Sequence, residues 1–180
     1  YQNITDTNTQ GLDAGCYTNM VNLLANTDDY KFNVLLTPGI YDGGNLVSQV
    51  STIITNTQNR GDNIYVLDLV KYAKTVSDAT TQAAFKNTSY AASYWPWTQV
   101  IEPSTGQLVW VPASTMIGGV YAYNDSVAEP WFAPAGINRG GLSTVVRAER
   151  KLSQSDRDTL YTGKVNPIAT FPGEIGRAHV

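Results

Sequence analysis

An apolar segment, a segment with helical periodicity and a second apolar segment follow one another between residues 32 and 70. Residues 32–37 and 64–70 are mainly apolar runs of strand length. Between them, residues 44–60 carry apolar side chains at helical spacing and stop at Gly61-Asp62. A strand, a helix of about four turns and a second strand form the right-handed crossover unit, which makes the two strands parallel. Because strands this apolar are covered on both faces, we predict an α/β fold with a mixed, largely parallel sheet flanked by helices.

The first apolar run is followed by Pro38-Gly39, which we expect to stop the strand. The expected buried face of the helix at 44–60 consists of Leu46, Val47, Val50, Ile53, Ile54 and Thr57.

The segment before this unit predicts an amphipathic helix. Residues 1–12 are polar, and we assign them to a loop or to the end of a preceding segment. From Asp13, which can serve as the N-cap, to residue 26, apolar side chains recur at helical spacing. Because Cys16 lies in that pattern and the chain has no second cysteine, we expect a buried, unreactive thiol. The predicted apolar face consists of Cys16, Met20, Val21, Leu23 and Leu24.

A β-hairpin is predicted around residues 93–111. Residues 93–102 and 107–111 have strand character, and the four residues between them carry Pro and Gly in turn-compatible places. The other predicted elements are a helix at 76–86, a helix from Pro112 to about Asn124, a Pro-rich loop at 129–136, a segment at 142–149, a short helix at 156–161 opened by Ser153 or Ser155, and a strand at 165–171.

The sequence lacks the residue patterns of common catalytic and ligand sites. A serine hydrolase needs a base for its nucleophile, but the one histidine of the chain is His179, and no G-x-S-x-G elbow occurs. Ser114 lies at a predicted helix start, where we expect it to satisfy backbone donors. The glycines after the first strand lack a phosphate-binding pattern, and no ligand spacing for a metal is present. We therefore assign no catalytic, cofactor-binding or metal residue and predict a protein that is not an enzyme.

Carboxylates are the remaining candidates for acid–base chemistry. Nothing in the sequence shows that any two converge, so we expect them to cap elements or face solvent. These residues are Asp28, Asp29, Asp42, Asp68, Asp125 and Glu129.

The composition favours partners that are recognised by shape. The 12 basic and 15 acidic residues give a formal charge of -3 without long charged blocks, so we expect neither nucleic acid nor a membrane as partner. The chain also has 11 Tyr and 4 Trp, and aromatic, charge-poor surface is typical of interface centres. A well-filled core is the alternative explanation, and for the four tryptophans the flanking Pro residues and strand context favour core packing.

Several motifs between residues 89 and 173 match one family as a set. They are Ser89-Tyr90-Ala91-Ala92-Ser93-Tyr94-Trp95-Pro96-Trp97, Trp110-Val111-Pro112-Ala113-Ser114, Gly119-Val120-Tyr121-Ala122-Tyr123-Asn124-Asp125, Trp131-Phe132-Ala133-Pro134-Ala135-Gly136, Asn138-Arg139-Gly140, and Val165-Asn166-Pro167-Ile168. Their order and spacing resemble the core of the contractile phage tail sheath family. The sequence departs from the family at Ala113, where a second Pro is often found, and at Tyr123, where an Arg is often found, so no contact of that Arg is carried over to this chain. The motif residues expected to have structural or interface roles are Tyr94, Trp95, Pro96, Trp97, Trp110, Pro112, Ser114, Gly119, Asp125, Trp131, Pro134, Asn138, Arg139, Gly140, Asn166 and Pro167.

The resemblance implies a structural subunit of a contractile tail sheath. Such subunits polymerise around the tail tube, contract to drive it through the host envelope, and have a partly subtilisin-like core. Other sheath subunits, the tail tube and baseplate proteins are then the expected partners, and the virion tail, assembled in the host cytoplasm, is the expected location. The alternatives are a host-receptor or glycan-binding tail module and, less favoured, a hydrolase on a subtilisin-like scaffold.

The resemblance also predicts how the chain is divided. Residues 13–173 are assigned to the sheath core domain. Residues 174–180 can be back-translated as GAGATCGGAAGAGCACACGTC, which matches a common sequencing adapter, so we expect them to be foreign sequence. The N- and C-terminal arms that link neighbouring sheath subunits are then expected to be missing.

Overall fold

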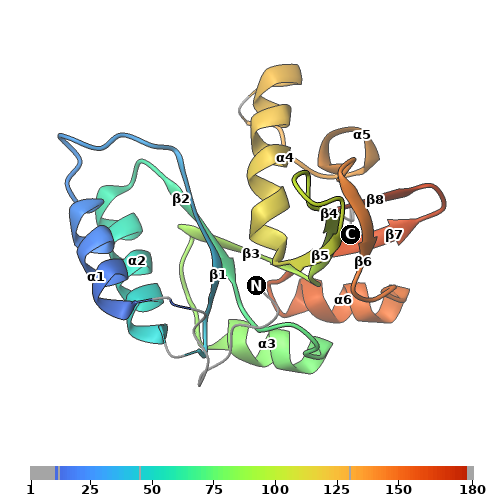
Figure 1. Cartoon of the computed structure of the whole chain (residues 1–180), viewed down its shortest axis with the longest axis horizontal. Coiled ribbons are helices and arrows are strands. Elements are labelled where there is room, and N and C mark those ends of the chain that lie inside the picture. The colour runs from blue at the N-terminus through green and yellow to red at the C-terminus, as the bar shows by residue number, and fades with distance from the viewer. Residues whose placement is uncertain (1–10, 12, 45, 130, 178–180) are drawn as a thin grey trace.

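A five-stranded sheet forms the centre of the molecule (Figure 1). The computed structural model describes residues 11, 13–44, 46–129 and 131–177. In the order β1-β2-β3-β7-β8, the first four strands are parallel and β8 is antiparallel to β7. This arrangement confirms the predicted largely parallel sheet. The strands are β1 (Val34–Tyr41), β2 (Ile64–Asp68), β3 (Ala91–Trp95), β7 (Asn166–Phe171) and β8 (Glu174–Arg177).

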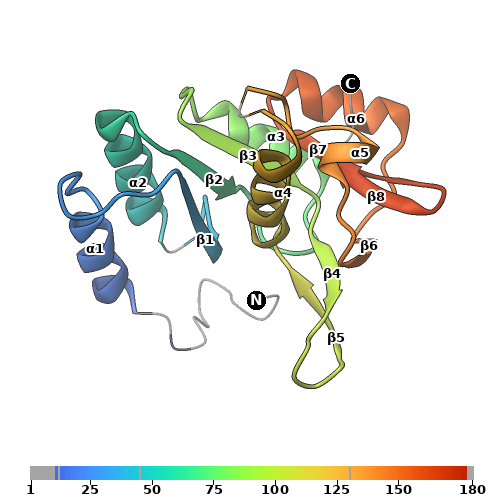
Figure 2. The same cartoon turned by 90° about the horizontal axis from the view of Figure 1, so that it is seen from above.

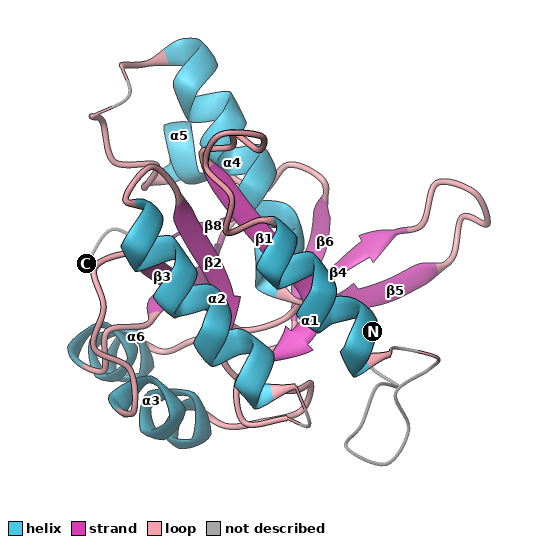
Figure 3. Cartoon of the chain, turned by 90° about the vertical axis from the view of Figure 1, so that its left-hand side faces the viewer, coloured by secondary structure: helices cyan, strands magenta, loops and turns pink. Residues whose placement is uncertain are grey.

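Helices lie on both faces of this sheet (Figure 3). The helices α1 (Ala14–Leu23), α2 (Val47–Arg60), α3 (Val76–Ala84) and α6 (Gln154–Thr162) contribute to the core on one face, whereas α4 (Ala113–Val127) packs on the other. The short α5 (Ile137–Gly140) lies beside α4 and β8. The predicted crossover is confirmed, because α2 connects the parallel neighbours β1 and β2.

Alternating side chains of the strands supply the two cores. Tyr65 and Leu67 of β2 belong to the core shared with α2, and Val66 between them belongs to the core shared with α4. In the same way, Trp95 of β3 packs on the first side and Tyr94 on the second. Period-two alternation with apolar residues on both sides explains why these strands appear as continuous apolar runs in the sequence.

Local signals determine most helix ends. The Asp13 carboxylate accepts a hydrogen bond from the Gly15 N–H and caps α1 as predicted, and Gly61 ends α2 with a φ of 70°. Ser153, one of the two predicted candidates, forms a capping box with Asp156 at the start of α6. The same arrangement at α3 was not predicted, although Thr75 and Asp78 have the required spacing.

A second, three-stranded antiparallel sheet contains the hairpin. Its strands are β4 (Thr98–Ile101), β5 (Leu108–Val111) and β6 (Val145–Ala148), in the order β5-β4-β6. Figure 2 shows that the β4–β5 hairpin projects from the body of the molecule. The hairpin is confirmed, but the prediction of one strand over 93–102 is wrong. Residues 91–95 belong to the large sheet, and at Pro96, which has no N–H for a ladder, the chain passes into the small sheet.

The predicted stop at Pro38-Gly39 is also wrong. β1 continues through both residues to Tyr41, with a register shift between Leu36 and Tyr41 and a φ of 91° at Gly39. Because β1 is an edge strand, a proline there does not break a ladder on its outer side.

The prediction of a buried Cys16 is contradicted. Cys16 is exposed, and its thiol donates to the Asp13 carboxylate at 3.2 Å. The buried stripe of α1 is narrower than the apolar pattern suggested, because Leu23 is also exposed and Val21 is the one fully buried residue of the helix. On α2, Val47 is likewise exposed.

The prediction that residues 174–180 are foreign is not tested by the fold. β8 uses 174–177 of this segment, and 178–180 lie outside the described residues. Most of the predicted N-terminal loop, residues 1–10 and 12, also lies outside them.

Candidate functional site

Two carboxylates, Asp42 and Asp68, meet at the carboxyl edge of the parallel sheet. Asp68 ends β2 and Asp42 follows β1, and the Asp42 N–H donates to the Asp68 carbonyl oxygen at 2.8 Å. Both residues are buried. Ligands of open α/β sheets bind at this edge, so it is the first place to look for chemistry.

Both oxygens of the Asp68 carboxylate accept hydrogen bonds from the start of α4. Its Oδ1 accepts from the Ser114 N–H at 3.2 Å, and its Oδ2 accepts from the Ser114 hydroxyl at 2.5 Å. Burial raises the pKa of Asp68 to about 7, while the two hydrogen bonds from Ser114 act in the opposite direction. We expected the Ser114 side chain to accept a hydrogen bond from a backbone N–H at the helix start. Instead, the Asp68 carboxylate accepts from the Ser114 N–H, and the Ser114 hydroxyl donates to the same carboxylate.

The Asp42 carboxylate binds side chains from α3 and from the segment after it. Its Oδ2 accepts from the Gln82 amide at 2.6 Å, and its Oδ1 lies 3.0 Å from the Lys86 ammonium group. The adjacent Tyr65 hydroxyl is hydrogen-bonded to Thr37 at 2.7 Å, and burial raises the pKa of Tyr65. These polar groups connect strands to helices at this edge of the sheet.

The remaining predicted carboxylates do not join this edge. Asp28, Asp29, Asp125 and Glu129 are exposed. Within the described residues, no three histidine, cysteine or acidic side chains are grouped as a metal site would require. None of the helices in that part of the chain combines the length and apolar character needed to cross a bilayer.

Two family motifs that are distant in sequence lie side by side in the large sheet. Tyr94 pairs with Asn166 and Trp95 with Pro167 in the parallel β3–β7 ladder. The Asn166 amide donates to the Ser93 carbonyl oxygen at 3.0 Å. These contacts are buried or half-buried in the centre of the sheet. The motif residues Tyr94, Trp95, Asn166 and Pro167 therefore belong to the packed interior of the fold.

A stack of aromatic and polar side chains joins the large sheet to the small one. The Trp97 indole N–H donates to the Val70 carbonyl oxygen at 3.0 Å, and the Tyr72 ring lies between Trp97 and Trp110, 5.9 and 5.2 Å from their centroids. The Arg147 guanidinium lies 5.2 Å from the Trp110 ring and donates to Gln99 at 2.6 Å. Trp95 and Trp97 are core residues as predicted, and Trp110 is half-buried.

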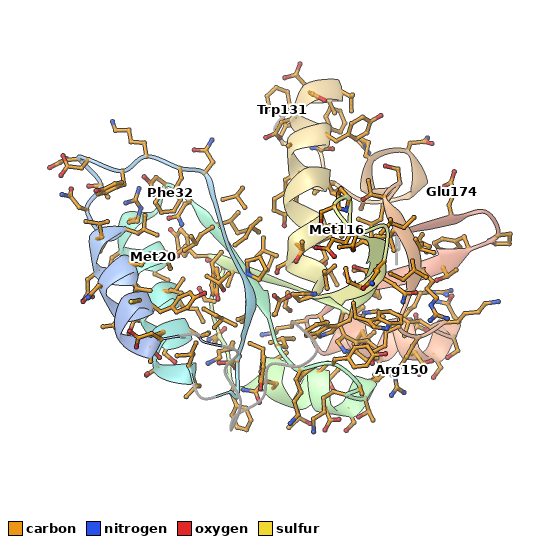
Figure 4. All side chains as sticks on the ribbon, viewed as in Figure 1. Met20, Phe32, Met116, Trp131, Arg150 and Glu174 are labelled. Carbon is orange, nitrogen blue, oxygen red and sulfur yellow. The ribbon has the colours of Figure 1, made fainter. Side chains whose placement is uncertain are left out.

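The prediction of core packing is wrong for Trp131, which is 78% exposed. It lies at the far end of α4 (Figure 4). Near it in the sequence, Tyr123, Val127 and Phe132 are also exposed, and we name these four residues the aromatic patch. Large apolar surface of this kind on a folded domain marks an interaction site.

Residues around the aromatic patch hold it in place. Asn124 of α4 donates from its amide to the Phe132 carbonyl oxygen at 3.1 Å, and the Arg139 guanidinium lies 4.9 Å from the centre of the Phe132 ring. A side chain at Gly140 would meet the Ala135 Cα at 3.0 Å and the Pro134 carbonyl oxygen at 3.2 Å, so glycine permits this close approach. These contacts attach Phe132 to α4 and α5.

An open groove of about 920 Å³ lies next to the patch. Its walls are formed by α4, α5, β6 and the β7–β8 turn, and Tyr123 belongs to both the groove and the patch. Two motif residues, Gly119 and Asn138, face it, and a Cβ added at Gly119 would meet no atom within 4 Å.

The structure therefore divides the motif residues into three groups. A sheet-centre group contains Tyr94, Trp95, Pro96, Trp97, Asn166 and Pro167, with Trp110 at its margin. An α4-start group contains Pro112, at the N-cap position rather than the predicted first turn, and Ser114. A group near the patch and groove contains the exposed or half-buried residues Gly119, Asp125, Trp131, Pro134, Asn138 and Arg139, together with the buried Gly140.

Sequence reasoning missed Tyr72 and Arg147 and did not pair Asp68 with Ser114. The position of Asp68 at the end of an apolar strand was a usable signal, because the carboxyl edge of a parallel sheet is where polar groups from different elements meet. Tyr72 and Arg147 belong to no motif, and only the packing of the two sheets brings them to Trp110.

Comparison with known proteins gives a consistent result at the level of families. A model described as the phage tail sheath protein central domain matches residues 15–175. Tail sheath proteins of Vibrio phage KVP40 and Enterobacteria phage T4 are 43% and 37% identical over 65 residues, which is 36% of this chain and 10% of each relative. The tail sheath protein of Salmonella phage ViI is 28% identical over 93 residues, which cover 52% of this chain and 15% of that protein. The chain thus spans a small part of these relatives.

A solved structure shares the fold. It is titled as the cryo-EM structure of the anti-feeding prophage baseplate, 6-fold symmetrised. The superposition has a TM-score of 0.66 at 17% identity and covers 92% of this chain and 42% of that one.

Proposed function

Because the chain belongs to the phage tail sheath family, we propose that it is the core of a subunit that polymerises around a tail tube and contracts. The observation that carries this proposal is the match of the central-domain model to residues 15–175. Members of this family are structural components of the virion, and the chain is one of these structural proteins.

The surface of the chain supports an assembling role. The aromatic patch exposes Trp131 and Phe132, and aromatic residues of this kind are typical of interface hot spots. A charge-poor chain with exposed apolar residues is suited to repeated contacts between identical subunits.

We propose that the carboxyl edge of the sheet is structural and that the protein performs no catalysis. Asp68 and Asp42 are each bound to groups of their own fold, Ser114 in one case and Gln82 with Lys86 in the other. Buried carboxylates held in this way connect elements and do not face a substrate.

The proposed partners are other sheath subunits, the tail tube and baseplate proteins. Contraction requires two packings of the same subunits with different free energies, which rigid domains can provide by shifting against each other. We place assembly in the host cytoplasm, and neither a membrane nor nucleic acid is part of the proposal.

Electron microscopy of the full-length gene product tests this function. We expect long sleeves or tubes, and a strictly monomeric full-length protein would count against the proposal. The 180-residue chain alone should polymerise poorly if exchanged terminal arms connect the subunits, so tubes formed by this chain would contradict the role of the arms.

We also propose that residues 174–180 are not part of the natural protein. The test is the parent nucleotide read, because synonymous codons that depart from the adapter sequence would exclude this origin.

A further inference from the structure

Strand β5 is an apolar edge strand on the hairpin that projects from the body of the molecule (Figure 2). In the order β5-β4-β6 it pairs with β4 on one side only. Its four residues, Leu108 to Val111, include no charge and no proline, and its ladder with β4 has no bulge. Native proteins usually protect a free edge with one of these devices, because an unprotected edge pairs with further strands. β5 therefore offers an open pairing edge.

The backbone groups on this open edge belong to Leu108 and Trp110. The Glu102 N–H donates to the Gln107 carbonyl oxygen at 2.8 Å, so these two residues form a hydrogen-bonded pair at the end of the ladder. Such pairs alternate along an antiparallel ladder, so Val109 also directs its backbone groups toward β4. Leu108 and Trp110 direct theirs away from β4. Among the residues that the structure describes, none pairs with these outward groups.

The outward groups of β5 fit those of a second β5 that runs in the opposite direction. With Val109 on the two-fold axis, Leu108 of each copy stands opposite Trp110 of the other, and each pair can exchange both of its backbone hydrogen bonds. A shift of the register in one direction brings in Pro112, which has no N–H. A shift in the other direction brings in Gly106, whose N–H already donates within the turn. The sequence around β5 thus favours a single register.

The same register covers apolar side chains that the single chain leaves exposed. Leu108 is 54% exposed and Trp110 is half-buried, and an aliphatic and an aromatic side chain directly opposite each other stabilise a sheet. Ile101, the partner of Leu108 in the ladder, is also exposed. Glu102 is the one charged residue between positions 98 and 111. Antiparallel strands keep the two Glu102 carboxylates apart, whereas parallel strands would place them side by side, so charge selects the antiparallel direction.

We propose that two copies of the chain associate through β5 and join their small sheets into one continuous sheet around a two-fold axis at Val109. The contact uses the same surface of both copies, so it closes after two copies and does not continue into a ring or a helix. It is therefore separate from the contacts that would build a sleeve and does not rest on the proposed function. A contact of one short strand is small, so the dimer is weak and reversible, and it shields the open edge of a free subunit.

Disulfide formation at position 109 tests the axis. In a Cys16→Ser background, which removes the one cysteine of the chain, Val109→Cys places two thiols at a non-hydrogen-bonded pair. The Cα atoms of such a pair are about 4.5 Å apart, which a disulfide can span. Under mild oxidation we expect the covalent dimer to form about tenfold faster than with Val146→Cys, an exposed valine on the other edge strand of the small sheet. Equal rates would overturn the proposal.

Leu108→Pro tests the backbone hydrogen bonds. It removes an outward N–H and leaves the ladder with β4 intact, because that N–H is not used there. Combined with Val109→Cys, it should slow disulfide formation about fivefold, whereas Leu108→Val, which keeps the N–H and an apolar side chain, should leave the rate within about twofold. Circular dichroism verifies folding, and Leu108→Lys, which places a charge opposite Trp110 of the other copy, replaces Leu108→Pro if that variant is not fully folded. An unchanged rate in the folded variant would show that the two edges do not pair.

Sedimentation equilibrium of the chain gives the stoichiometry. The weight-average mass should rise toward that of a dimer with concentration and not beyond it, and Leu108→Pro should remain monomeric at the same concentrations. A chain that stays monomeric throughout, or that proceeds to trimers and longer species, would contradict a two-fold contact. Electron microscopy of the full-length protein tests tube formation independently, so either result leaves the test of the sheath function unaffected.

Discussion

The carboxylate of Asp68 receives both the backbone N–H and the hydroxyl of Ser114, 46 residues further along the chain. This pair joins the end of a central strand to the first turn of the helix that covers it. The helix dipole also favours a carboxylate at this position, because α4 has 15 residues and the Ser114 N–H in its first turn donates to Asp68.

Removal of the carboxylate should cost more stability than removal of the hydroxyl. Asp68→Ala leaves two buried donors unsatisfied and should lower the free energy of unfolding by about 2–4 kcal/mol, against about 1 kcal/mol for Ser114→Ala. Urea denaturation followed by circular dichroism measures both, and the double variant gives their coupling. Equal losses in the two single variants would show that Asp68 does not satisfy the helix start.

The raised pKa of Asp68 makes the stability dependent on pH. The folded state holds this proton up to about pH 7, whereas the ordinary value is 3.8, so the folded state binds more protons between these values. The contribution of Asp68 is therefore complete below about pH 4 and is lost as the pH rises through 7. The unfolding free energy of the protein minus that of Asp68→Asn should fall over this range. A difference that is constant with pH would contradict the assignment.

Arg60 should hold the segment between α1 and β1 in place. Its guanidinium donates to the carbonyl oxygens of Leu24, Asn26 and Tyr30 and also pairs with Asp62 at 2.9 Å. Lysine cannot make this set of planar contacts, so Arg60→Lys should lower stability by about 1–3 kcal/mol.

Limited proteolysis gives a local readout of the same change. Cleavage within residues 24–31 should accelerate in Arg60→Lys, while Arg150→Lys, at an exposed arginine, serves as the control. Identical digestion of the two variants would mean that Arg60 does not order this segment.

Two motif tryptophans should respond in opposite ways to truncation. Trp97→Ala removes a buried ring and its hydrogen bond to Val70 and should cost about 3–5 kcal/mol. Trp131→Ala should change stability by less than about 0.5 kcal/mol, because the side chain is exposed. Thermal unfolding of both variants distinguishes a packing role from a surface role, and a large loss for Trp131→Ala would place that residue in the core.

The sequence predicted best those features that depend on neighbouring residues. Gly61 ends α2 and Asp13 caps α1 because each acts on backbone groups within one turn. The crossover was predictable because its helix and strands have different periodicities. The failure at Pro38 has another origin, since whether a proline interrupts a sheet depends on which strand lies at the edge.

The candidate site was predictable as a set of residues and not as a geometry. The motifs of β3 and β7 could be recognised, but their register, with Tyr94 opposite Asn166, is established by folding of the intervening chain. Trp131 and Trp97 have similar aromatic and Pro-rich surroundings in the sequence, and only the tertiary structure exposes one and buries the other.

The short passage from β3 to β4 has a mechanical consequence. Two residues, Pro96 and Trp97, connect the central strand of the large sheet to the projecting hairpin, and the Trp97 indole is tied to Val70. A pull on the hairpin tip is thus transmitted to a strand that is hydrogen-bonded on both sides, to β2 and to β7. In mechanical terms, the hairpin is attached to the middle strand of the large sheet and not to its margin.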